Sequence, residues 1–145
     1  MCNAMCATDG YHRSFFRNCA GRPSMFSASL LSIIEEASVA VLTLAEGLER
    51  EEFLRSRLTR AEVSRQLKTM TDIAIKLPPE TRAQMAEVDW EGWTATARQI
   101  SQPGPEADEA LWFATQALIP ATIMWLRVYR QNQPELFEYT APPAE

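Results

Sequence analysis

The chain has very little of the chemistry on which most metal sites and hydrolytic sites depend. Its 145 residues include one histidine and three cysteines, and all four lie before residue 20: Cys2, Cys6, His12 and Cys19. Their spacing matches no standard zinc motif, so we expect no metal site and no cofactor. The absence of cysteine from the rest of the chain is typical of a protein of the reducing cytoplasm.

Positive charge is also scarce. The chain carries 14 basic and 19 acidic residues, a formal net charge of −5, whereas binding to nucleic acid depends on clustered lysine and arginine. The densest basic group contains Arg50, Arg55, Arg57, Arg60, Arg65 and Lys68. Glutamates are interleaved with these residues, which favours a solvated helix face, so we do not expect nucleic acid as a partner.

The chain also lacks a continuous apolar run of the kind found in a secretory signal or a membrane span. Residues 1–24 show no periodicity, and we interpret them as a disordered extension, with Met25 as an alternative start of the protein. The uncharged run from Ala110 to Leu126 is shorter than the roughly 20 apolar residues that a span needs. It also contains Gln116 and Pro120, so we expect no membrane insertion.

Helical periodicity is what the sequence does contain. Hydrophobic residues make up 46% of the chain, and they recur at the three-to-four spacing of amphipathic helices. One predicted helix begins near Ser27, ends at Gly47 and carries a stripe of Leu30, Ile34, Ala37, Val41, Leu44 and Leu48. A second begins with a capping box of Thr59 and Glu62, ends at Pro78 and carries Val63, Leu67, Met70, Ala74 and Leu77.

The remaining elements complete a predicted all-α antiparallel bundle of four to five helices over residues 25–131. A short helix over residues 49–55 contributes Phe53 to the core, and Asp89 caps a helix in which Trp93 is a core anchor. Asp108 is predicted to cap the last helix, and Pro120 should either kink that helix or mark the point where two helices meet end to end. Short connections favour antiparallel neighbours, and residues 132–145 are expected to form a loosely packed or disordered tail.

Several patterns between Glu46 and Arg130 resemble the HepT-like family, small helical bundles that include the ribonuclease toxins of HepT and MntA type toxin–antitoxin pairs. The family's short Phe-Leu helix, its Leu-Thr cap and its Arg-Asn-Leu helix resemble EGLEREEFLRSRLTRAEVSRQL, which includes Arg65. Its Gly-Glu-Ala-Ala segment resembles MTDIAIKL, with Asp72 in place of the glutamate. Trp90 opens the next helix, and a Trp-containing final helix with an internal proline completes the resemblance.

The residues that would carry the family's chemistry are replaced. The resemblance implies an Arg that holds phosphate, followed by a His that moves protons during RNA cleavage, and often by a Tyr. Here Ala97 stands at the Arg position, with Arg98 one residue later, Gln102 at the His position and Gly104 at the Tyr position. Glutamine cannot act as a general acid or base, so we expect no catalytic residue.

The resemblance therefore predicts a catalytically degenerate homodimeric module of the cytoplasm, whose expected partner is an MntA-type minimal nucleotidyltransferase. Remnants of the family's cleft, still able to contact a ligand, would be Arg65, Asp72, Arg98 and Gln102. In the alternative interpretation, Arg65 and Asp72 simply pair across helices.

The apolar last helix is predicted to form the dimer or partner interface through Trp112, Ile119, Ile123 and Leu126, because a helix that is apolar all round suits burial between subunits. Two alternative functions stay open. One is a working ribonuclease toxin that uses Arg98 and an unconventional base. The other is a membrane-surface protein that uses the face from Ala110 to Leu126.

Overall fold

The computed structural model describes residues 25–138, and every regular element within this range is helical. The elements are α2 (Met25–Ala45), α3 (Arg50–Arg55), α4 (Arg57–Lys76), α5 (Pro79–Gln84), α6 (Trp90–Gln99), α7 (Pro105–Phe113), the π-helix η1 (Ala114–Leu118), α8 (Ile119–Asn132) and the 3₁₀-helix η2 (Pro134–Leu136). The all-α prediction is confirmed. The expected N-terminal extension lies outside the described residues, together with the three cysteines and His12.

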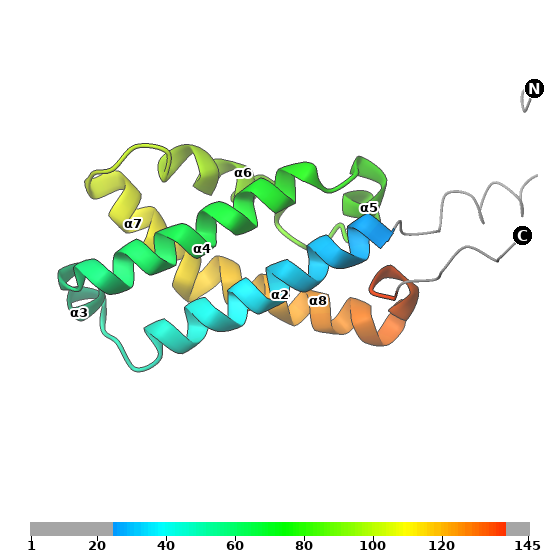
Figure 1. The fold of residues 1–145 in the computed structure, drawn as a ribbon, viewed down its shortest axis with the longest axis horizontal. Coiled ribbons are helices and arrows are strands. Elements are labelled where there is room, and N and C mark those ends of the chain that lie inside the picture. The colour runs from blue at the N-terminus through cyan, green and yellow to red at the C-terminus, as the bar shows by residue number, and fades with distance from the viewer. Residues whose placement is uncertain (1–24, 139–145) are drawn as a thin grey trace, which may run out of the picture.

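The long helices alternate in direction, as the short connections require. Figure 1 shows α2 and α4 side by side and antiparallel, with α6 on the other side of α4 and the combined helix α7–η1–α8 closing the bundle. The small helix α3 joins α2 to α4 and also contacts α7. The result is one antiparallel bundle whose core runs along its full length.

Helix α4 is the central element, and its buried stripe is as predicted, with Val63, Leu67, Met70, Ala74 and Leu77 all in the core. Its start differs from the prediction. The N-cap is Ser56, whose hydroxyl oxygen accepts a hydrogen bond from the Thr59 amide at 3.3 Å. The capping box of Thr59 and Glu62 is therefore wrong, because the helix begins one turn earlier than the sequence pattern suggested.

Helix α2 also follows its predicted stripe except near the end. Leu44 is 40% exposed, whereas Ala45 is buried. At 100° per residue, a step of four from Val41 stays closer to the stripe than a step of three. The stop at Gly47 is confirmed, since its φ of 73° lies in the left-handed region that glycine tolerates.

Of the two caps predicted for α6 and α7, the first is confirmed and the second is wrong. The Asp89 carboxylate accepts a hydrogen bond from the Gly92 amide at 2.8 Å, which confirms the predicted cap of α6. The predicted cap at Asp108 is wrong, because α7 begins at Pro105 after Gly104. Asp108 lies within the first turn, where its carboxylate accepts a hydrogen bond from the Arg60 guanidinium at 2.7 Å.

The last helix is interrupted just before Pro120, as predicted. Residues 114–118 form a π-helix, and Pro120 occupies the first turn of α8. A proline lacks the amide that would continue the α-helical ladder, so a wider turn is accommodated here. Between α8 and residue 138 the chain stays attached to the bundle, since Leu136 is 1% exposed and belongs to the core. The rest of the predicted tail lies outside the described residues.

Two helical stretches, Phe26–Ala45 and Pro105–Asn132, are long and apolar enough to cross a membrane by length and composition alone. Core helices of soluble proteins satisfy the same two criteria, and both stretches supply many core residues here.

Candidate functional site

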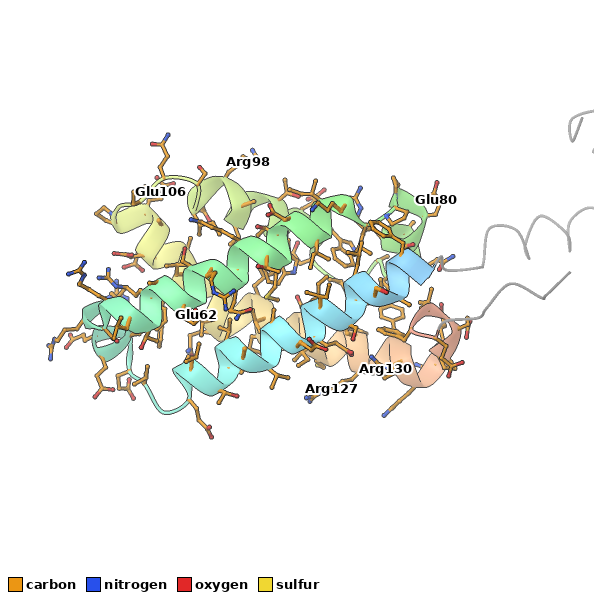
Figure 2. The ribbon with its side chains drawn as sticks, in the orientation of Figure 1. Glu62, Glu80, Arg98, Glu106, Arg127 and Arg130 are labelled. Carbon is orange, nitrogen blue, oxygen red and sulfur yellow. The ribbon has the colours of Figure 1, made fainter. Side chains whose placement is uncertain are left out.

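The loop between α6 and α7 forms an open hollow of about 480 Å³ at one end of the bundle. Its lining consists of Arg98, Gln99, Ser101, Gln102, Pro103, Gly104, Pro105 and Glu106. Figure 2 shows Arg98 and Glu106 near this loop, on the outside of the molecule. Two of the four predicted cleft residues, Arg98 and Gln102, are thus brought to one place.

Local sequence explains the shape of this loop. Buried Ile100 fixes the end of α6 in the core, and the Ser101 hydroxyl donates a hydrogen bond to the Arg98 carbonyl oxygen at 2.6 Å. Gly104 has a φ of 153°, a backbone conformation that residues with a Cβ rarely adopt. Pro105 then starts α7. The backbone is set by these residues, while the side chains of Arg98 and Gln102 remain exposed.

The other two predicted cleft residues do not line this hollow. Arg65 and Asp72 are seven residues apart on α4, about two turns, and both are exposed on the face opposite the core stripe. They do not pair with each other either, which corrects the alternative prediction. The Arg65 guanidinium instead donates two hydrogen bonds to Glu62, from Nε at 3.0 Å and from Nη2 at 2.6 Å.

This ion pair accounts for the clearest electrostatic perturbation in residues 25–138. Hydrogen bonds from Arg65 and Gln66 lower the pKa of Glu62 from 4.5 to about 2, and the Glu62 carboxylate raises the pKa of Arg65. Glu62 lies on the viewer-facing side of α4 (Figure 2). Because each group satisfies the other, the pair stabilises the helix surface and is not poised for proton transfer.

The hollow can hold an anion or a polar group, but it offers no general base that titrates near neutral pH. Its ionisable side chains are the Arg98 guanidinium and the exposed carboxylate of Glu106. Within residues 25–138, no three His, Cys, Asp or Glu side chains are grouped so that they could hold a metal ion.

The residues predicted for an interface are mostly buried within one copy of the chain. Ile119 and Leu126 are completely buried and Ile123 is 6% exposed. These three side chains belong to the core, which corrects the prediction that they form an interface. Trp112 is half-buried and packs on Phe53 of α3, with ring centroids 5.3 Å apart.

A different set of residues forms the outer face of the last helix. The exposed positions between the buried ones are Phe113, Gln116, Ala117, Ala121 and Met124. None of them is charged, and Phe113 and Met124 are 59% and 50% exposed. We call this surface the α7–α8 face. The sequence contained the signal, an uncharged run too long for one buried stripe, but periodicity alone did not show which side faces outward.

The chain matches no protein-family model, no curated protein and no solved structure.

Proposed function

We propose that the chain is a catalytically inactive, homodimeric protein-binding module of HepT-like type that works in the cytoplasm. The observation that carries this proposal is the α7–α8 face, which leaves two large apolar side chains exposed and has no charged residue between Phe113 and Met124. Contiguous exposed apolar patches on soluble proteins mark interaction surfaces. Association would remove the exposed parts of Phe113 and Met124 from water, which favours the complex through the hydrophobic effect.

The α7–α8 face is suited to pairing with itself about a two-fold axis. In an antiparallel crossing with the axis at the junction of η1 and α8, Phe113 lies opposite the partner subunit's Met124. Gln116 then lies opposite the partner subunit's Ala121, and each contact occurs twice. Ala117 and Ala121 are small, which favours a close approach of the two helices. No like charges meet, because the face carries none.

The loss of catalysis is supported by the hollow of the α6–α7 loop. Gln102 stands at the position that corresponds to the family's His, and the lining includes no other side chain that exchanges protons near neutral pH. Arg98, one residue after the position of the family's Arg, lines the same hollow and can hold an anionic group. We infer that the scaffold of the family has been kept for association.

Light scattering coupled to size exclusion tests the homodimer. We expect a dimer for the wild-type chain and monomers for Phe113→Glu and Met124→Glu, because each places two charges in an apolar contact. Ile75→Glu is the matched control, since Ile75 is 57% exposed but lies on α4, and it should leave the dimer intact. A wild-type chain that is monomeric at every concentration would overturn the proposal.

The resemblance supports an MntA-type minimal nucleotidyltransferase as the protein partner. Co-expression of the chain with the protein encoded by its neighbouring gene, followed by affinity purification, should recover both. A chain that co-purifies with no such protein would contradict this part of the proposal. Fractionation of the same cells tests membrane association. The proposed module should be recovered without detergent in the soluble fraction.

An active ribonuclease is the second candidate, favoured only by the place of Arg98 in an open hollow. It predicts growth arrest on expression of the chain and loss of that arrest in Arg98→Ala. The inactive module proposed above predicts normal growth and intact cellular RNA for both chains.

A further inference from the structure

Leu58 is the most exposed large apolar residue in the described part of the chain, at 86%. It lies in the first turn of α4, beside an open hollow of about 590 Å³ lined by Arg57, Leu58, Arg60 and Ala61. Arg57, Ala61 and Lys68 share the outward face of α4, because they are four and seven residues apart. The Ser56 hydroxyl caps the start of α4. The surface around Leu58 therefore consists of side chains and does not depend on the backbone amides of the first turn.

The basic residues around Leu58 fall into two groups. Three of them form ion pairs with carboxylates of the same chain: Arg50 with Glu109, Arg60 with Asp108 and Arg65 with Glu62. The other three, Arg55, Arg57 and Lys68, form no ion pair with any residue from 25 to 138. Positive charge therefore remains available on both sides of an exposed leucine, although the whole chain carries a net charge of −5.

We propose that this surface, defined by Arg55, Arg57, Leu58, Ala61 and Lys68, binds an acidic segment of a partner protein. An apolar side chain of that segment covers Leu58 and Ala61, and its carboxylates meet the three basic residues. Arginine is enriched among the residues that contribute most binding energy at protein interfaces, and complementary charge selects the partner. The proposal rests on the protein-binding function proposed above, but it does not require the homodimer.

An acidic peptide suits this surface better than a nucleic acid does. The unpaired basic residues are few, and apolar side chains lie between them. The preceding helix α3 carries Glu51 and Glu52, both exposed, which repel a continuous phosphate backbone but tolerate a short segment with spaced carboxylates. The surface is also distinct from the α7–α8 face, since its residues come from α3 and from the first three turns of α4.

Amide chemical-shift titration of the full chain tests the proposal with three probes. They are a short synthetic peptide of alternating glutamate and leucine, the same peptide with glutamine for glutamate, and an oligouridylate. We expect the glutamate peptide to shift the amides of Arg57, Leu58 and Ala61 and to bind more tightly than the other two. Leu58→Ser and Arg57→Glu should each weaken that binding by about tenfold.

Two substitutions at the far end of the same helix serve as controls. Ile75→Ser removes an exposed apolar side chain, and Lys76→Glu makes the same charge change as Arg57→Glu. Both should leave peptide binding unchanged. The proposal is overturned if the glutamate peptide causes no shifts near Leu58, if the control variants weaken binding equally, or if the oligouridylate binds more tightly. Light scattering on the same samples reports the homodimer separately, so failure of one proposal is distinguishable from failure of the other.

Discussion

Trp93 shows how a single residue ties two helices together. Its indole Nε1 donates a hydrogen bond to the Thr122 hydroxyl at 3.0 Å, and that hydroxyl donates to the Leu118 carbonyl oxygen at 2.7 Å. Trp93→Phe removes a buried donor, so we expect the free energy of unfolding in urea to fall by about 1–3 kcal/mol. In a Thr122→Val background, where the hydrogen bond is already lost, the same change should cost about 1 kcal/mol less. Equal costs in the two backgrounds would contradict this role.

The ion pair between Glu62 and Arg65 makes a prediction about pH. The folded-state pKa of Glu62, about 2, lies below its ordinary value of 4.5. The pair therefore stabilises the folded chain above about pH 4.5, and this contribution is lost as the pH falls towards 2. A carboxyl titration followed by NMR should give the low pKa in the wild-type chain. In Arg65→Met the pKa of Glu62 should move back towards 4.5, and an unchanged value would refute the assignment.

At the scale of single residues, the sequence predicted the buried positions better than it predicted polar partners. Val63, Leu67 and Trp93 were predicted because periodicity reports directly which side of a helix meets the core. Glu62 and Asp108 were both assigned to caps, whereas each carboxylate accepts hydrogen bonds from an arginine. A cap and an ion pair need the same residue types, and only the position of the arginine decides between them.

The C-terminal element is more firmly attached than a loosely packed tail would be. Leu136 is 1% exposed, and the Arg130 guanidinium, which pairs with Glu35, lies 4.5 Å from the ring centre of Phe137. Leu136→Ala should lower the free energy of unfolding by about 2–5 kcal/mol, because it opens a cavity in the core. Exposed Glu135 is the control, and Glu135→Ala should change stability by less than about 0.5 kcal/mol. Similar effects for both variants would show that the tail is not packed.

The π-helix explains why the face of the last helix could not be assigned from the sequence. Pro120 predicted an interruption, and the structure has one, but the wider turn of residues 114–118 changes the angular positions of everything before it. The residues predicted for the interface, among them Trp112, Ile119 and Leu126, therefore lie on the side of the helix that faces the core. The outward positions Phe113 and Met124 become evident only when both halves of the helix are placed against the bundle.

In the molecule as a whole, the surfaces proposed to have a function lie on different parts of one helical bundle. The hollow at Arg98 is formed by the α6–α7 loop, the surface around Leu58 by α3 and α4, and the α7–α8 face by the last helix. The fold class and the order of helices followed from the sequence because local periodicity determines them. The surfaces did not, because they depend on which side chains remain uncovered after packing.

In the proposed homodimer, two copies of the chain associate through the α7–α8 face in an antiparallel crossing. The most direct measurement is disulfide cross-linking of a chain with Phe113→Cys and Met124→Cys, in a background where the three native cysteines are replaced by serine. Within one chain these positions are about 16 Å apart along the helix, too far for a disulfide to join them. We expect covalent dimers under mild oxidation, formed efficiently only when both cysteines are present. A double-cysteine chain that stays monomeric, or that cross-links no better than a control pair on α4, would contradict it.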